Sequence, residues 1–231
     1  MIQRDFHKTF DRTRRFVVEG LLWQGTARAY ALVVWALLAG LLWLALDLLN
    51  VSSSNWPLLS LELFLVAVLA AVAAIDARFA IIPDSLILAL VVGGVAHIVV
   101  LGSREMWLPG EGASEASKLT LQFGMVAWRS LDALMAFLGA ALLRAGYQAL
   151  RGREGFGFGD VKFIGAAALW VGIGMVPLML IVAVFSAFGT IGLLRKQVGA
   201  LGGGDAIPFG PHLAVGLWLS VLVAGEINGG G

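Results

Sequence analysis

The sequence predicts an all-α, polytopic membrane protein with about seven transmembrane helices, and three observations support this. Of its 231 residues 59% are hydrophobic and only 13% are charged, which leaves too little polar surface to cover a soluble domain of this length. The apolar residues gather in runs that approach the roughly 20 residues a membrane-spanning helix needs. If these runs cross a bilayer in turn, most of the basic residues lie on the same side of it. The lipid bilayer is therefore the first expected partner.

Seven apolar runs define the predicted spans in chain order. They lie at residues 30–49, 57–75, 85–101, 131–150, 161–176, 178–194 and 211–224, of which the fifth and the seventh are short. Residues 1–29 form a basic segment expected in the cytoplasm, residues 30–224 form the transmembrane domain, and residues 225–231 form a short tail. The longest polar stretch, 102–129, contains the turn signal Pro109-Gly110 and is expected to fold outside the bilayer.

The distribution of Lys and Arg predicts the orientation. With the N-terminus in the cytoplasm, 13 of the 16 Lys and Arg residues fall on the cytoplasmic side, and only Arg104, Lys118 and Arg129 fall outside. Cytoplasmic loops of membrane proteins carry such an excess of positive charge. The sequence therefore predicts a cytoplasmic N-terminus and a C-terminus outside. The tryptophans expected to anchor span ends at the interfaces are Trp43, Trp56, Trp107, Trp128 and Trp218.

Composition also argues against several partners and cofactors. The chain has no cysteine, which excludes disulfides, thiolate nucleophiles and cysteine zinc sites. Its net charge is +1 and no segment concentrates enough basic residues for a nucleic-acid partner. His97 and His212 are isolated and lack metal-ligand spacing, so we expect packed or interfacial histidines, no metal and no cofactor. The sequence leaves the oligomeric state open.

Two aspartates are the best candidates for chemistry. In the predicted topology Asp76 ends the second span and Asp160 opens the fifth, both at the cytoplasmic face. Acidic residues within spans are costly and usually mark a functional site with a partner. The alternative is that each only flanks a helix; Asp160 suits that role at a helix N-terminus, whereas Asp76, at a C-terminus, does not.

A glycine-rich run leads into Asp160. Its sequence from residue 155 to 159 is Gly-Phe-Gly-Phe-Gly, and alternating glycines let the backbone approach another chain closely. The spacing differs from the G-x-G-x-x-G of dinucleotide sites. The run therefore predicts a place where an extended substrate reaches the carboxylate, with a plain loop as the alternative.

Three short motifs carry a resemblance to a known family. They are Gly157-Phe158-Gly159-Asp160, then Asp76 with the following Ile82-Pro83-Asp84, and Pro208-Phe209-Gly210-Pro211. The first resembles the GxGD signature of intramembrane aspartyl proteases, and the three in this order resemble the type IV prepilin peptidase family. The resemblance covers about residues 61–217.

The resemblance implies a membrane-embedded aspartyl endopeptidase in the cytoplasmic (inner) membrane of a prokaryote. Its substrates would be pilin-like precursors of a pilus or a secretion system, cut after a basic leader at the cytoplasmic face. Asp76 and Asp160 would be catalytic, and the residues that support the motifs or bind substrate would be Gly157, Phe158, Gly159, Pro208, Phe209, Gly210 and Pro211. Because many members carry a cysteine-containing region and also methylate the product, the cysteine-free sequence resembles a shorter member with peptidase activity alone.

Two alternative functions stay open. A proton-coupled transporter could use Asp76 and Asp160 as a relay, although neither an inverted repeat nor mid-membrane carboxylates are evident. An inactive scaffold would leave both aspartates without a purpose.

The charged residues near the motifs are expected to have minor roles. Lys162 is expected to be a cytoplasmic topology charge. Asp84 is expected to complement the dipole of the helix that it opens, and Glu154 or Asp205 to contact the basic leader.

Overall fold

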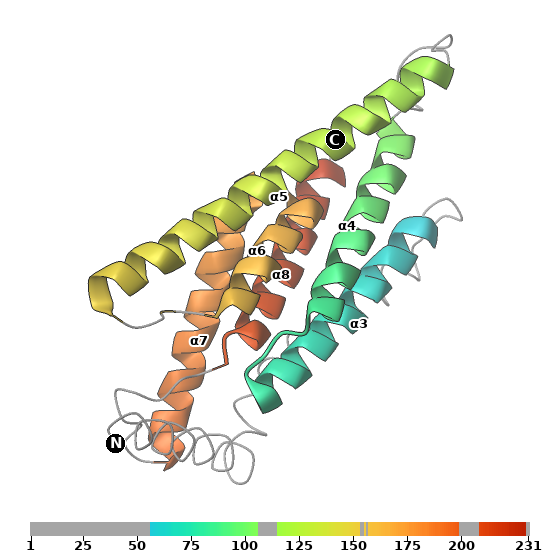
Figure 1. The fold of residues 1–231 in the computed structure, drawn as a ribbon. Helices are drawn as coiled ribbons and strands as arrows, with labels where there is room; N and C mark the ends of the chain where they lie inside the picture. Colours follow the sequence, from blue (N-terminus) through green and yellow to red (C-terminus); the bar gives the residue numbers. More distant parts are fainter. Residues whose placement is uncertain (1–55, 106–114, 153–154, 156, 199–207, 230–231) are drawn as a thin grey trace.

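The computed structural model describes residues 56–105, 115–152, 155, 157–198 and 208–229. The predicted first span at 30–49, the basic segment 1–29, Glu154 and Asp205 lie outside these residues. The elements are α3 (Trp56–Phe79), α4 (Asp84–Glu105), α5 (Glu115–Arg151), α6 (Phe158–Val171), the 3₁₀ turn η2 (Ile173–Met175), α7 (Val176–Val198) and α8 (Gly210–Gly229) (Figure 1). All regular structure in the described ranges is helical, which confirms the all-α prediction.

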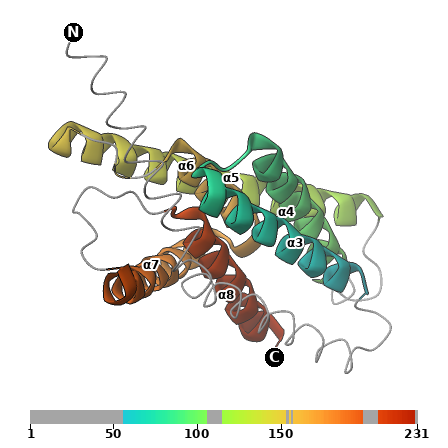
Figure 2. The ribbon, with the colours of Figure 1, turned by 90° about the horizontal axis from the view of Figure 1, so that it is seen from below.

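Helix α6 lies at the centre of the bundle. It packs against α5, α4 and α8, while α8 also contacts α7 and α3. Figure 2 shows α8 between α7 and α3 when the bundle is seen from below. Eleven of the 14 residues of α6 are buried, as expected of a helix that is apolar on every side. Small residues bring the helices close together, because Gly165 of α6 lies against Phe137 of α5.

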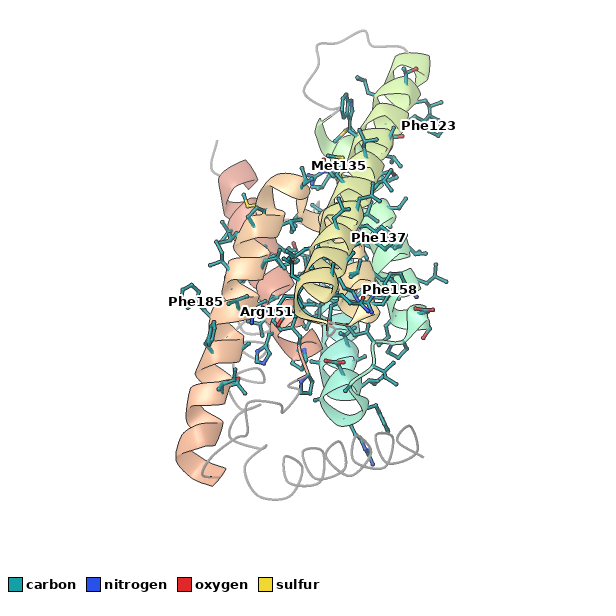
Figure 3. The ribbon with its side chains drawn as sticks, turned by 60° about the vertical axis from the view of Figure 1, so that its left-hand side comes forward. Phe123, Met135, Phe137, Arg151, Phe158 and Phe185 are labelled. Atoms are coloured by element: carbon teal, nitrogen blue, oxygen red, sulfur yellow. The ribbon has the colours of Figure 1, made fainter. Side chains whose placement is uncertain are left out.

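Four described helices are long and apolar enough to cross a membrane, so the chain is a multi-pass membrane protein. These segments are Trp56–Phe79, Asp84–Leu101, Leu119–Arg151 and Ile173–Gly192, and the apolar part of α8, Gly210–Ala224, is shorter. Large apolar side chains point away from the bundle, among them Phe123, Met135 and Phe185 (Figure 3). Lipid is the natural contact for such a surface. The count of seven spans and the orientation of the termini stay predictions.

The prediction of one continuous span over residues 161–176 is wrong. Helix α6 ends at Val171, and Gly172 then adopts a positive φ of 75° before the 3₁₀ turn. At 1.5 Å per residue, its 14 residues extend about 21 Å, less than the roughly 30 Å of the hydrocarbon core. Because hydropathy stays high through this break, the composition of the segment concealed it.

The polar stretch at 102–129 is helical over most of its length, and its place outside the bilayer stays a prediction. Helix α4 continues to Glu105 and α5 begins at Glu115. Helix α5 has 37 residues, about 55 Å at the standard rise, and runs diagonally across the bundle (Figure 1). Helix α5 contains no proline, which would break it. Polar side chains are tolerated on a helix that has an apolar face, so the helix can extend into the polar stretch.

Two smaller differences concern the last helix. Trp218, predicted to anchor a span at the interface, is only 1% exposed. It belongs to the core because α8 is enclosed by its neighbours. Helix α8 also extends past the predicted end at Ala224 to Gly229.

Candidate active site

Asp76 lies in the last turn of α3, with its side chain 5% exposed. The helix ends one turn later, where the N–H of Ala80 donates to the carbonyl oxygen of Asp76 at 2.7 Å. Its Oδ2 accepts a hydrogen bond from the backbone N–H of Gly210, also at 2.7 Å. The carboxylate therefore faces the positive end of another helix, α8, which offsets its unfavourable place at the C-terminus of its own helix.

The segment before α8 is shaped to meet this carboxylate. Phe209 precedes the helix, and its carbonyl oxygen accepts hydrogen bonds from the N–H groups of His212 and Leu213, each at 3.0 Å. A Cβ atom at Gly210 would lie 2.7 Å from Asp76 Oδ2 and 2.8 Å from Asp76 Cβ. Glycine is therefore the residue that allows this contact. Pro208 is half-buried and Pro211 is buried.

Asp160 lies in the first turn of α6, with its side chain 7% exposed. Its Oδ2 accepts the backbone N–H of Gly157 at 3.0 Å, so the carboxylate caps the N-terminus of its own helix. A Cβ atom at Gly159 would lie 3.3 Å from Ile82 Cβ, which places this turn against the α3–α4 connection. The half-exposed ring of Phe158 meets Phe137 edge-on, with ring centroids 6.2 Å apart (Figure 3).

The fold brings the two aspartates together from opposite halves of the described chain. The charge of Asp76 acts electrostatically on the carboxyl group of Asp160. Helix α8 packs against both α3 and α6, and α4 also contacts both. The packing of these helices thus sets how the two carboxyl groups lie relative to one another.

The two histidines lie apart from one another as packed side chains. His97 stacks on Trp170, with ring centroids 5.1 Å apart, and Trp170 Nε1 donates to the carbonyl oxygen of Leu90 at 2.9 Å. His212 Nδ1 lies 2.9 Å from Ser186 Oγ. Among the residues that the structure describes, no group of three His, Asp or Glu side chains is placed to hold a metal ion.

One contact at the site was missed by sequence reasoning. Lys162 was expected to serve only as a topology charge, but its Nζ lies 2.6 Å from Asp84 Oδ1. The same ammonium lies 5.2 Å from the ring centroid of Phe158. Asp84 opens α4 as predicted. The only signal in the sequence was that Asp84 belongs to one motif and Lys162 lies two residues after another, because a contact across 78 positions leaves no periodic pattern.

The sequence is similar to those of known proteins of one family. The profile of the type IV leader peptidase family matches residues 63–192, which include Asp76 and Asp160. A prepilin leader peptidase/N-methyltransferase of Dickeya chrysanthemi is 31% identical over 191 residues, covering 80% of this chain and 56% of the relative. The enzyme of the same description from Aeromonas hydrophila is 29% identical over 177 residues, covering 75% and 52%.

A third relative matches over a shorter region. The prepilin leader peptidase/N-methyltransferase of Pseudomonas putida is 37% identical over 82 residues, covering 35% of this chain and 28% of the relative. The chain thus spans about half the length of the two longer matches. No solved structure matches it. Because the family profile covers more than half of the sequence, this chain belongs to the type IV leader peptidase family.

Proposed function

We propose that this protein is a membrane-embedded aspartyl endopeptidase that cleaves the leader from type IV pilin-like precursors at the cytoplasmic membrane face. The observation that carries the proposal is the pair of buried carboxylates, Asp76 and Asp160, brought within electrostatic reach by α3 and α6. Family membership supplies the substrate class. The proposed location is the inner membrane of a prokaryote.

The pair supplies both proton transfers that peptide hydrolysis requires. One carboxylate accepts a proton from water, and the oxygen of that water bonds to the scissile carbonyl carbon. The other carboxyl group, which begins protonated, donates its proton to the departing amide nitrogen as the C–N bond breaks. The N–H groups of Gly210 and Gly157 hold Asp76 and Asp160 in place, and such preorganised geometry accounts for much of an enzymatic rate.

The glycine-rich approach to α6 suits an extended substrate. Gly157 is exposed and Phe158 presents a half-exposed ring beside the aspartates. A cleaved peptide must reach the carboxylates in extended form, and glycine permits a close backbone approach. We therefore propose that Gly157 and Phe158 contact the substrate, while Gly159 and Gly210 allow close packing at the carboxylates.

Leader cleavage is the one activity that we propose for this chain. The relatives are named for both leader cleavage and N-methylation, but the chain matches only about half of their length. That matched part contains both aspartates. No observation in the described residues favours the transporter, and family membership argues against a proton relay.

The test is cleavage of a pilin-like precursor by the purified protein in detergent. Asp76→Asn and Asp160→Asn keep the size of the side chain and remove the acid, so each is expected to reduce cleavage to background. Asp132→Asn is the matched control, because Asp132 lies near Gly172 at the opposite end of α6; it is expected to leave cleavage at the wild-type rate. A wild-type protein that cuts no precursor, or either active-site variant cutting normally, would refute the proposal.

A further inference from the structure

The α3–α4 connection lies next to both helix turns that carry the aspartates. Helix α3 ends at Phe79, three residues after Asp76, and the following residue Ala80 takes a positive φ of 52°. The chain then places the buried side chain of Ile82 against Gly159, the residue before Asp160. The same short connection therefore begins after the helix turn that carries Asp76 and packs against the helix turn that carries Asp160.

A second link between these segments is electrostatic. Asp84 begins α4 immediately after the connection, and its Oδ1 lies 2.6 Å from Lys162 Nζ. Lys162 is two residues past Asp160, a spacing that places their side chains on different faces of α6. The ammonium also lies over the ring of Phe158 at 5.2 Å. Lys162 is thus held by the first turn of its own helix and by the start of α4.

We propose that Lys162 and Asp84 are positioning residues, whose ion pair holds the first turn of α6 against the α3–α4 connection and so sets the geometry of the aspartate pair. This inference rests on the proposed peptidase function. It adds a role to a lysine and an aspartate that do not themselves take part in the proton transfers.

The pair is poorly suited to a purely stabilising role. The side chains are 31% exposed for Lys162 and 78% exposed for Asp84, and ion pairs at such positions contribute little to folding because water screens them. The catalytic rate, in contrast, is sensitive to small changes in the position of the reacting groups, since a misplacement of about 1 Å can cost roughly 100-fold in rate. Loss of the pair is therefore expected to reduce kcat much more than it reduces stability.

Because the sequence has no cysteine, the charge at residue 162 can be removed and restored chemically. Lys162→Cys is expected to reduce kcat by about 10- to 100-fold, the range for a small misplacement of catalytic groups, with little change in KM. Alkylation with 2-bromoethylamine gives a side chain that ends in an ammonium at nearly the length of lysine. This reagent is expected to restore most of kcat, whereas iodoacetamide, which adds a neutral group of similar length, is not.

Two further variants show whether the restored charge acts through its partner. Asp84→Asn is expected to lower kcat to a similar extent, and aminoethylation of Lys162→Cys in that background should restore nothing. Arg78→Cys is the matched control, because Arg78 also lies two residues past an aspartate but contacts the ring of its neighbour Phe79 at 5.4 Å. Its kcat should stay within roughly twofold of wild type, as for an ordinary surface change, with either reagent.

The outcomes separate this inference from the proposed function. If the wild type cleaves the precursor and Lys162→Cys is fully active, or both reagents restore it equally, the positioning role is refuted. An increase in KM at unchanged kcat also refutes it, because that result indicates substrate binding. If the wild type cuts no precursor before or after either reagent, the proposed function fails and the inference fails with it.

Discussion

The contact between Gly210 and Asp76 gives a sharp prediction, because a single methyl group tests it. In Gly210→Ala the new Cβ would lie 2.7 Å from Asp76 Oδ2 and 2.8 Å from Asp76 Cβ and Cγ, whereas ordinary contacts begin at 3.4 Å. The shortfall of 3.4 minus 2.7, or 0.7 Å, involves Asp76 Cβ as well as the carboxylate. Rotation of the side chain cannot relieve all of it, so α3 or the start of α8 has to move.

The expected cost has two parts. Overpacking of this kind reduces the free energy of unfolding by about 1–3 kcal/mol. A shift of this size at Asp76, which we propose to be catalytic, approaches the roughly 1 Å misplacement that costs on the order of 100-fold in rate. We therefore expect Gly210→Ala to lower kcat/KM for precursor cleavage by about 10- to 100-fold while the protein still folds.

The assay compares precursor cleavage and thermal unfolding in detergent for two glycine variants. Gly189→Ala is the control, because Gly189 lies within α7 and a Cβ there meets no atom within 4 Å. It should cleave normally and gain about 0.5–1 kcal/mol of helix stability. Wild-type cleavage by Gly210→Ala would refute the reasoning, and so would an equal loss of activity in Gly189→Ala.

Two further predictions concern packing away from the carboxylates. Gly216→Ala would drive a Cβ into the carbonyl oxygen of Met179, a backbone atom that cannot rotate away. We expect the free energy of unfolding to fall by about 1–3 kcal/mol, which lowers the thermal unfolding temperature. Gly124→Ala, whose Cβ meets no atom within 4 Å, should show no such loss. Trp170→Phe removes the N–H that donates to the buried carbonyl of Leu90. The loss of this hydrogen bond should cost about 0.5–1.5 kcal/mol, so unchanged unfolding curves would contradict this account.

Much of the helical architecture could be predicted from the sequence. The expected spans at 57–75, 85–101 and 178–194 fall within α3, α4 and α7. Such agreement is possible because the preference of a residue for lipid over water is a local property that sums along a helix. Membership of the family was likewise predictable, because its motifs are short runs of adjacent residues; that Asp76 and Asp160 are the catalytic pair stays a proposal.

Other features required the tertiary structure. The break at Gly172 and the full length of α5 were hidden, because hydropathy does not report backbone torsion or how far a helix continues beyond its apolar part. The Lys162–Asp84 pair was hidden for a related reason, since a charged side chain near the membrane surface suits topology and pairing equally well.

The position of Asp76 separates the two sources of information most clearly. The sequence by itself determined that this carboxylate ends an apolar helix, where the helix dipole disfavours it, and hence that it needs a partner. Only the tertiary structure decided that the partner is the N–H of Gly210 at the start of α8. The reason is physical: the sequence determines what each residue requires locally, whereas the partner that meets the requirement depends on how distant helices pack.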